Sequence, residues 1–135
     1  MAELHQVPVS LALVLCEHAW QDPSGRWFIL GTFKCLAARG FPARVASIAV
    51  YTALTGGQGE QALRLVLRDA DGTAVGETTV SVTFPNPAAT VEGAFNLQQV
   101  MFPAAGPYSL SLYAGDHFLA ERRLEIVPAP WAPGP

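Results

Sequence analysis

The sequence predicts an all-β protein, a single antiparallel β-sandwich of about eight strands. Residues 61–84 contain two runs in which apolar and polar side chains alternate, and residues 69–72 separate them. Strict alternation is typical of strands with one buried face, and the Asp-Gly connection favours a hairpin. Turn signals recur roughly every 8–12 residues, and no segment has a sustained helical period, which favours a sandwich.

The hairpin at residues 61–84 organises the predicted fold. A four-residue loop pairs Leu67 with Ala74, so that the apolar sides of both strands face the same way. This arrangement places Leu65, at the centre of the first run, in the core. The inward faces are Leu63, Leu65 and Leu67 on one strand and Val80, Val82 and Phe84 on the other.

Further strands follow from alternation between turns. In the segment 27–36, Gly31 predicts a bulge or the close approach of another backbone. In the last hairpin, matching faces require a three-residue turn with Gly115 at positive φ, and Arg122 then points inward, at the rim or at a bulge. The predicted strands are residues 9–17, 27–36, 44–54, 90–97, 108–112 and 117–127, besides the organising hairpin.

The chain divides into a sandwich domain, residues 1–127, and a Pro-rich tail, residues 128–135. The tail reads PAPWAPGP, which we expect to be extended or disordered and not part of a sheet. The dipeptides Phe41-Pro42, Phe84-Pro85 and Phe102-Pro103 each indicate a strand end or a cis peptide bond.

Composition excludes several functions and favours a cytoplasmic protein. Half of the 135 residues are hydrophobic, the net charge is −3, and the eight Lys and Arg residues form no basic stripe, so we expect no nucleic-acid partner. No apolar run is long enough to span a bilayer, and we expect no membrane partner. Residues 9–16 read VSLALVLC, either a buried first strand or a targeting segment, and the missing positive charge before them favours the strand.

Two cysteines, Cys16 and Cys35, suit free thiols in a reducing compartment. A hairpin that turns at residues 21–25 places them on opposite faces, where they cannot bridge. A different register would bring them together, so a disulfide stays as the alternative.

The ionisable residues predict no catalytic site, metal site or cofactor. The histidines His5, His18 and His117 stand alone, without the spacing of a metal site. A buried cysteine among leucines is normally inert, and no nucleophile motif is present. Residues 56–59 resemble a phosphate-binding loop only in their glycines and lack the following Lys and helix, so a turn is the better interpretation.

Two surface hypotheses remain. Three aromatic side chains, Trp20, Trp27 and Tyr113, form a possible platform for a small ligand or carbohydrate. Strand 44–54 is apolar on both faces, and with no amphipathic helix to cover it we expect a homodimer that buries Ile48, Val50 and Leu54. Loops lying over that face are the alternative. The leading hypothesis is a non-catalytic, self-associating interaction module, with a ligand- or carbohydrate-binding sandwich as the alternative.

The order of several short motifs resembles a family of small uncharacterised bacterial proteins, a domain of unknown function. The resemblance covers residues 11–127 and implies an immunoglobulin-like sandwich, without activity or catalytic residues. The motifs are LVLC at 13–16, LGTF at 30–33, Phe41-Pro42, LTGGQGE at 54–60, LVLRD at 65–69, FPNP at 84–87 and GPY at 106–108.

Overall fold

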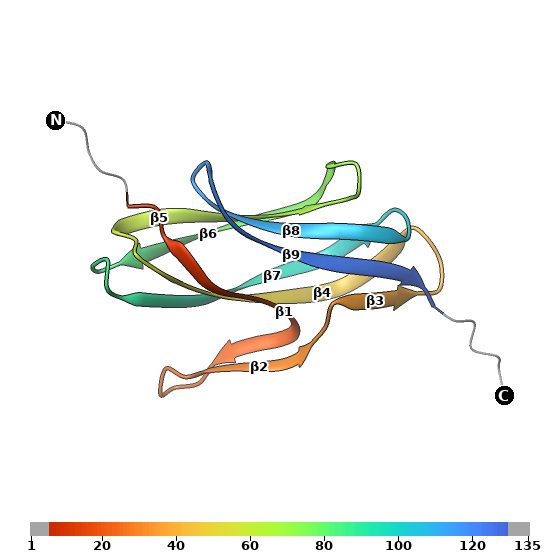
Figure 1. Ribbon diagram of the computed structural model, residues 1–135. Helices are drawn as coiled ribbons and strands as arrows, with labels where there is room; N and C mark the ends of the chain where they lie inside the picture. The colour runs from red at the N-terminus through yellow and green to blue at the C-terminus, as the bar shows by residue number, and fades with distance from the viewer. Residues whose placement is uncertain (1–5, 130–135) are drawn as a thin grey trace.

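The computed structural model describes residues 6–129, which form nine strands in two packed sheets (Figure 1). No helix in this part of the chain has the length and apolar character needed to cross a bilayer. The strands are β1 Val9–Gln21, β2 Trp27–Thr32, β3 Cys35–Ala38, β4 Ala43–Thr55, β5 Gly59–Arg68, β6 Ala74–Phe84, β7 Thr90–Phe102, β8 Gly106–Ala114 and β9 His117–Pro128.

The two sheets confirm the predicted sandwich and its immunoglobulin-like topology. One sheet has the order β2-β1-β4-β7 and the other β3-β9-β8-β5-β6. Strands β1, β4 and β7 take the places of strands A, B and E of an immunoglobulin domain, and β5, β8 and β9 those of C, F and G.

The predicted strand 27–36 is two strands, which explains the ninth. The chain leaves the first sheet at Phe33, whose N–H donates to the Leu15 carbonyl at 3.2 Å. One residue later the Lys34 carbonyl accepts a hydrogen bond from the Glu125 N–H at 2.9 Å, in the second sheet. From there β3 runs parallel to β9, so the sandwich is not antiparallel throughout.

The organising hairpin forms with the predicted faces but a different register. Leu67 lies opposite Gly76 instead of Ala74, because the loop has five residues, 69–73, and the ladder bulges by one residue between Leu67 and Arg68. The loop is held by the Asp69 N–H, which donates to the Thr73 carbonyl at 2.9 Å. A shift of two residues preserves the side-chain alternation, so Leu63, Leu65 and Leu67 are buried as predicted.

In the β8–β9 hairpin the inward faces of the two strands match through a different turn length than predicted. Gly115 has the expected positive φ of 58°, but Ala114 pairs with His117, so the turn has two residues. A bulge between Leu112 and Tyr113 restores the matching faces. Arg122 lies opposite the buried Leu110 and is itself exposed, which places it at the rim of the sandwich.

The proposed dimer face was wrong, because its residues belong to the core. Ile48, Val50 and Leu54 point between the sheets and have at most 1% of their surface exposed. The core that they join contains, from both sheets, Leu13, Leu15, Leu63, Leu65, Leu67, Phe84, Phe95, Phe102, Leu110, Leu112, Leu124 and Ile126.

The start of the predicted tail belongs to a sheet. Pro128 is the last residue of β9 and lies opposite Ala38, and the Ala129 N–H donates to the Ala38 carbonyl at 2.6 Å. Proline fits here because β3 is a short edge strand at the end of the ladder. Residues 130–135, including Trp131, lie outside the described residues. Of the three Phe-Pro bonds, Phe41-Pro42 is cis.

Candidate interaction surface

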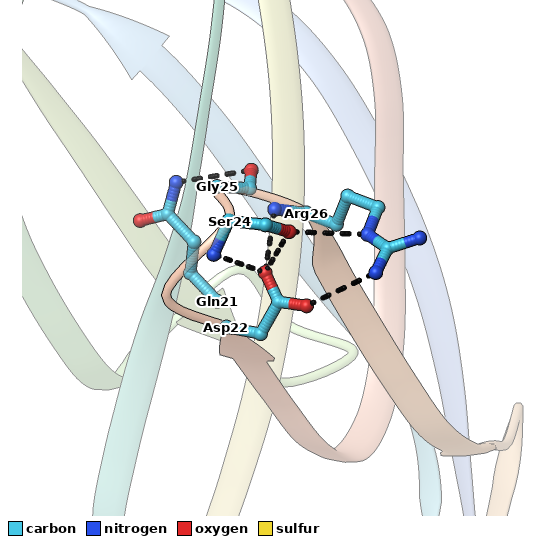
Figure 2. Close-up of polar contacts among 5 residues, drawn as sticks. All are labelled: Gln21, Asp22, Ser24, Gly25 and Arg26. Atoms are coloured by element: carbon cyan, nitrogen blue, oxygen red, sulfur yellow. Dashed lines mark hydrogen bonds and ion pairs between the residues drawn. The ribbon is translucent and has the colours of Figure 1, made fainter.

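A hydrogen-bonded turn joins β1 to β2. Oδ1 of Asp22 accepts hydrogen bonds from the Ser24 N–H at 2.9 Å, the Ser24 hydroxyl at 2.6 Å and the Arg26 N–H at 3.0 Å (Figure 2). The Gly25 N–H donates to the Asp22 carbonyl, and Gly25 has a φ of 91°, which glycine adopts without strain. One carboxylate therefore organises the whole loop and fixes the register of the strands on either side.

We expect the turn to loosen in acid. The Ser24 hydroxyl, and then the backbone N–H groups of the loop, hold the pKa of Asp22 below its usual range. Because the folded pKa is depressed, the stabilisation is present above the unfolded-state pKa and is lost as the pH falls through the folded one. In NMR titrations the Ser24 and Arg26 amide signals should shift together at a pH below about 3.9, the ordinary aspartate value. Asp22→Asn, which keeps an acceptor, should abolish this titration; a midpoint at the ordinary value in the native protein would contradict the assignment.

Strand β1 bends so that its second half and β2 fold back beneath the sheet of β4 and β7 (Figure 1). β1 pairs with β4 only as far as Cys16, which lies opposite Ala49. At the bend Gly31 has a φ of 70°, and a Cβ there would clash with the Glu17 carboxyl group. Gly31 is thus approached by the Glu17 side chain, whereas the sequence predicted a bulge or the close approach of another backbone.

The folded-back hairpin covers the outer face of β4. The Trp27 ring packs against Tyr51 with centroids 5.8 Å apart, and Cys16 and Ala49 are buried beside them. The Tyr51 hydroxyl in turn donates a hydrogen bond to the Glu92 carboxylate on β7. The chain therefore supplies from its own β1–β2 hairpin the cover that the sequence suggested a second copy would provide.

Tyr51, which Trp27 covers, should lose its proton at a higher pH than an ordinary tyrosine. Burial, together with the carboxylate of Glu92, raises the pKa of Tyr51 to about 12. A raised folded pKa means that the stabilisation is complete below the unfolded value of about 10 and is lost as the pH rises through the folded value. Glu92→Gln should lower the Tyr51 pKa only part of the way, because burial remains. Phenolate absorbance measures it, and a Tyr51 pKa near the ordinary value in the native protein would rule out the covered arrangement.

The opposite face of the hairpin is apolar and open to solvent. Trp20 lies opposite Phe28, and their rings stack with centroids 5.4 Å apart and planes inclined by 14°. Leu30 follows on the same face, opposite His18. Trp20, Phe28 and Leu30 are 46%, 39% and 55% exposed. We call these three side chains the hairpin face.

The predicted aromatic platform does not assemble, because its three residues lie in three different environments. Trp20 belongs to the hairpin face, whereas Trp27 points to the other side of the hairpin, onto Tyr51. Tyr113 lies on the other sheet, where its hydroxyl accepts a hydrogen bond from Arg68 at 3.0 Å. There the Arg64 guanidinium lies 4.5 Å from its ring centroid, a cation–π contact.

Phe28 and Leu30 were not among the surface residues predicted from the sequence. The signal was available, since a loop of residues 22–26 pairs Gln21 with Trp27 and so Trp20 with Phe28. The predicted turn at residues 21–25 gave a different pairing, in which Trp20 and Phe28 are not opposite each other. The exposure of the face also depends on how the hairpin folds back, and no local sequence pattern encodes that.

The cysteines and the possible metal ligands of the described residues bear on the predicted absence of a cluster. Both cysteines are free; Cys16 is buried, with its thiol near the Ala49 carbonyl at 3.6 Å and its pKa raised by burial, and Cys35 is exposed. Within residues 6–129 no three His, Cys, Asp or Glu side chains are placed to hold a metal ion. His5 lies outside this range.

Comparisons with known proteins identify a family and no activity. A sequence profile described as a family of unknown function (DUF6941) matches residues 11–127. No curated protein matches the sequence. Solved structures that resemble the chain include an immunoglobulin-like protein from Pseudomonas aeruginosa, with 16% identity, a TM-score of 0.45 and coverage of 88% of this chain and 95% of that one. Another is a β-glucuronidase from glycoside hydrolase family 2, with 15% identity, a TM-score of 0.49 and coverage of 62% of this chain, which spans only 11% of that enzyme.

Proposed function

The chain belongs to this family of unknown function (DUF6941), and we propose that it is a non-catalytic interaction module that self-associates through its hairpin face. The observation that carries the proposal is the exposure of Trp20, Phe28 and Leu30 side by side on a folded-back hairpin. Contiguous apolar side chains on a surface mark interaction sites, and aromatic residues are enriched among those that dominate binding.

A second copy suits this surface for two reasons. The three side chains of the hairpin face are themselves uncharged, so two copies can pack them together without burying an unpaired ion, and the exposed His18 lies beside them, opposite Leu30. A two-fold axis brings the same residues together from both sides, the usual geometry of homodimers. Three half-exposed side chains per copy bury well under the roughly 1,200 Å² of a standard interface, so we expect a weak, concentration-dependent dimer.

Sedimentation equilibrium tests the proposal with a matched pair of variants. From low micromolar to millimolar concentration, the wild type should shift from the 14.4 kDa chain mass towards twice that mass. Leu30→Lys should remain monomeric, whereas Leu11→Lys, at an equally exposed leucine outside the hairpin face, should dimerise like the wild type. A monomer at all concentrations, or a dimer unaffected by Leu30→Lys, would reject this interface.

A carbohydrate ligand is the second candidate, favoured by the geometry of Trp20 and Phe28. Their nearly parallel rings form a small aromatic surface of the kind on which a sugar ring can stack. A sugar that raises the melting temperature of the wild type and has no effect on Trp20→Ala would support this function. A glycan array on which the protein binds no sugar would contradict the carbohydrate-binding function.

We also propose that the protein works in a reducing compartment, the cytoplasm. The free thiols of Cys16 and Cys35 support this location, because exposed cysteines in oxidising compartments tend to be paired. Protein isolated from its native cells under thiol-trapping conditions should carry two blocked cysteines after unfolding. Mixed disulfides at Cys35 would argue for an oxidising location.

A further inference from the structure

The first half of β1 is an open edge of its sheet. Residues 9–16 pair with β4 on one side, but β2 pairs with β1 only from Cys16 onwards. Because Phe33 donates to the Leu15 carbonyl, the Leu15 backbone points to the side opposite β4. In a strand, alternate residues direct their N–H and C=O groups to the same side, so Leu13 presents its backbone to this open edge too.

This edge has little of the protection that sheets normally place on theirs. No charged residue occurs between Gln6 and Glu17, and Val9 and Leu11 are 58% and 56% exposed. Natural edge strands are commonly blocked by lysines, inward-pointing charges or covering segments. The bulge between Ser10 and Ala12 interrupts the ladder once and leaves Leu13 available beyond it.

The neighbouring strand β9 is open at the same margin but is protected. β9 pairs with β3 only over residues 125–128, and the inward-directed Arg122 stands on its open part. A groove of about 410 Å³ separates the two strands, lined by residues 10–14 of β1 and 119–122 of β9. Glu121 also lines the groove, and its carboxylate lies 4.0 Å from the Arg123 guanidinium. Within residues 6–129 no carboxylate lies within 4.0 Å of the Arg122 guanidinium, which therefore has no ion-pair partner there.

We propose that this groove binds an extended peptide segment of another protein, which adds as a strand to β1 and places a carboxylate beside Arg122. Strand addition recognises any extended chain through its backbone, and side-chain contacts in the groove then select the sequence. The charge of Arg122 favours an acidic peptide over a second copy, since the β1 edge of a second copy carries no carboxylate between Gln6 and Glu17. This site is separate from the hairpin face.

Binding to a defined peptide panel tests the proposal. The probes are short fluorescent peptides of alternating valine and threonine, in which one glutamate replaces each threonine in turn, each with a glutamine counterpart. Measured by anisotropy, at least one glutamate peptide should bind the wild type about tenfold more tightly than its glutamine counterpart. Arg122→Gln should remove the preference, and Arg39→Gln, at another exposed arginine, should keep it.

Amide exchange locates the bound peptide. The Leu13 amide should exchange more slowly in the complex, in the wild type and in the hairpin-face variant Leu30→Lys alike. No binding at millimolar peptide, or equal binding by the wild type and Arg122→Gln, would overturn the proposal. Protection of Leu13 without peptide, rising with protein concentration, would show that a second copy occupies the edge and would overturn it as well.

Discussion

Val50→Asp is expected to leave the protein largely unfolded at room temperature. Val50 is fully buried between the sheets, opposite Phe95 on β7, and no charged residue is buried among residues 6–129. An ionised carboxylate there loses its hydration without a partner, and the penalty is several kcal/mol per ion. Small domains have about 5–15 kcal/mol of stability in total, so a penalty of several kcal/mol removes nearly all of it when the stability lies at the lower end of that range.

The matched control lies four residues earlier on the same strand. Ala46 is exposed, and Ala46→Asp should leave the free energy of unfolding within about 0.5 kcal/mol of the wild-type value. Circular dichroism in denaturant compares the two variants. A Val50→Asp protein that stays folded as a monomer would mean that Val50 faces outward, as a dimer interface requires, and not into the core.

Leu65→Ala should cost about 2–5 kcal/mol, the range for leucines in well-packed cores. Leu65 lies at the centre of β5, paired on both sides with Thr78 of β6 and Leu112 of β8, and no solvent reaches it. Truncation removes its contacts with the core and leaves a cavity that strands held on both sides cannot close.

Leu30→Ala makes the same chemical change on the hairpin face. Because Leu30 is half exposed, the free energy of unfolding of this variant should change by about 0.5 kcal/mol or less in dilute solution. Urea unfolding measures both variants. A cost for Leu65→Ala below about 1 kcal/mol would place Leu65 outside the core.

Local alternation predicted most strands and their inward faces. Leu63, Leu65 and Leu67 are buried because the pleat alone decides which side chains share a face. The register of that hairpin was wrong, since a loop of five residues and a one-residue bulge beside Arg68 together shift the pairing by two residues, which leaves the alternation unchanged. A two-residue slip is invisible to a pattern with a period of two.

The prediction of the dimer face was wrong because contacts between distant parts of the chain decide what covers β4. Both faces of β4 are apolar, and the sequence shows correctly that both need cover, yet it does not show what covers them. Val50 faces the other sheet, and Tyr51 faces Trp27 on the folded-back hairpin. That contact depends on the bend of β1 beyond Cys16, which carries the β1–β2 hairpin beneath the sheet of β4 (Figure 1). The hairpin face became recognisable only once the position of this bend was known.

Acrylamide quenching of Trp20 tests most directly whether the hairpin face is the interface between copies. In a Trp27→Phe, Trp131→Phe background, Trp20 is the only tryptophan, and it is 46% exposed in the single chain. As the protein concentration rises and sedimentation reports a dimer, quenching of Trp20 should fall and its emission should shift to shorter wavelength. A dimer in which Trp20 stays as accessible as in the monomer would contradict self-association through the hairpin face.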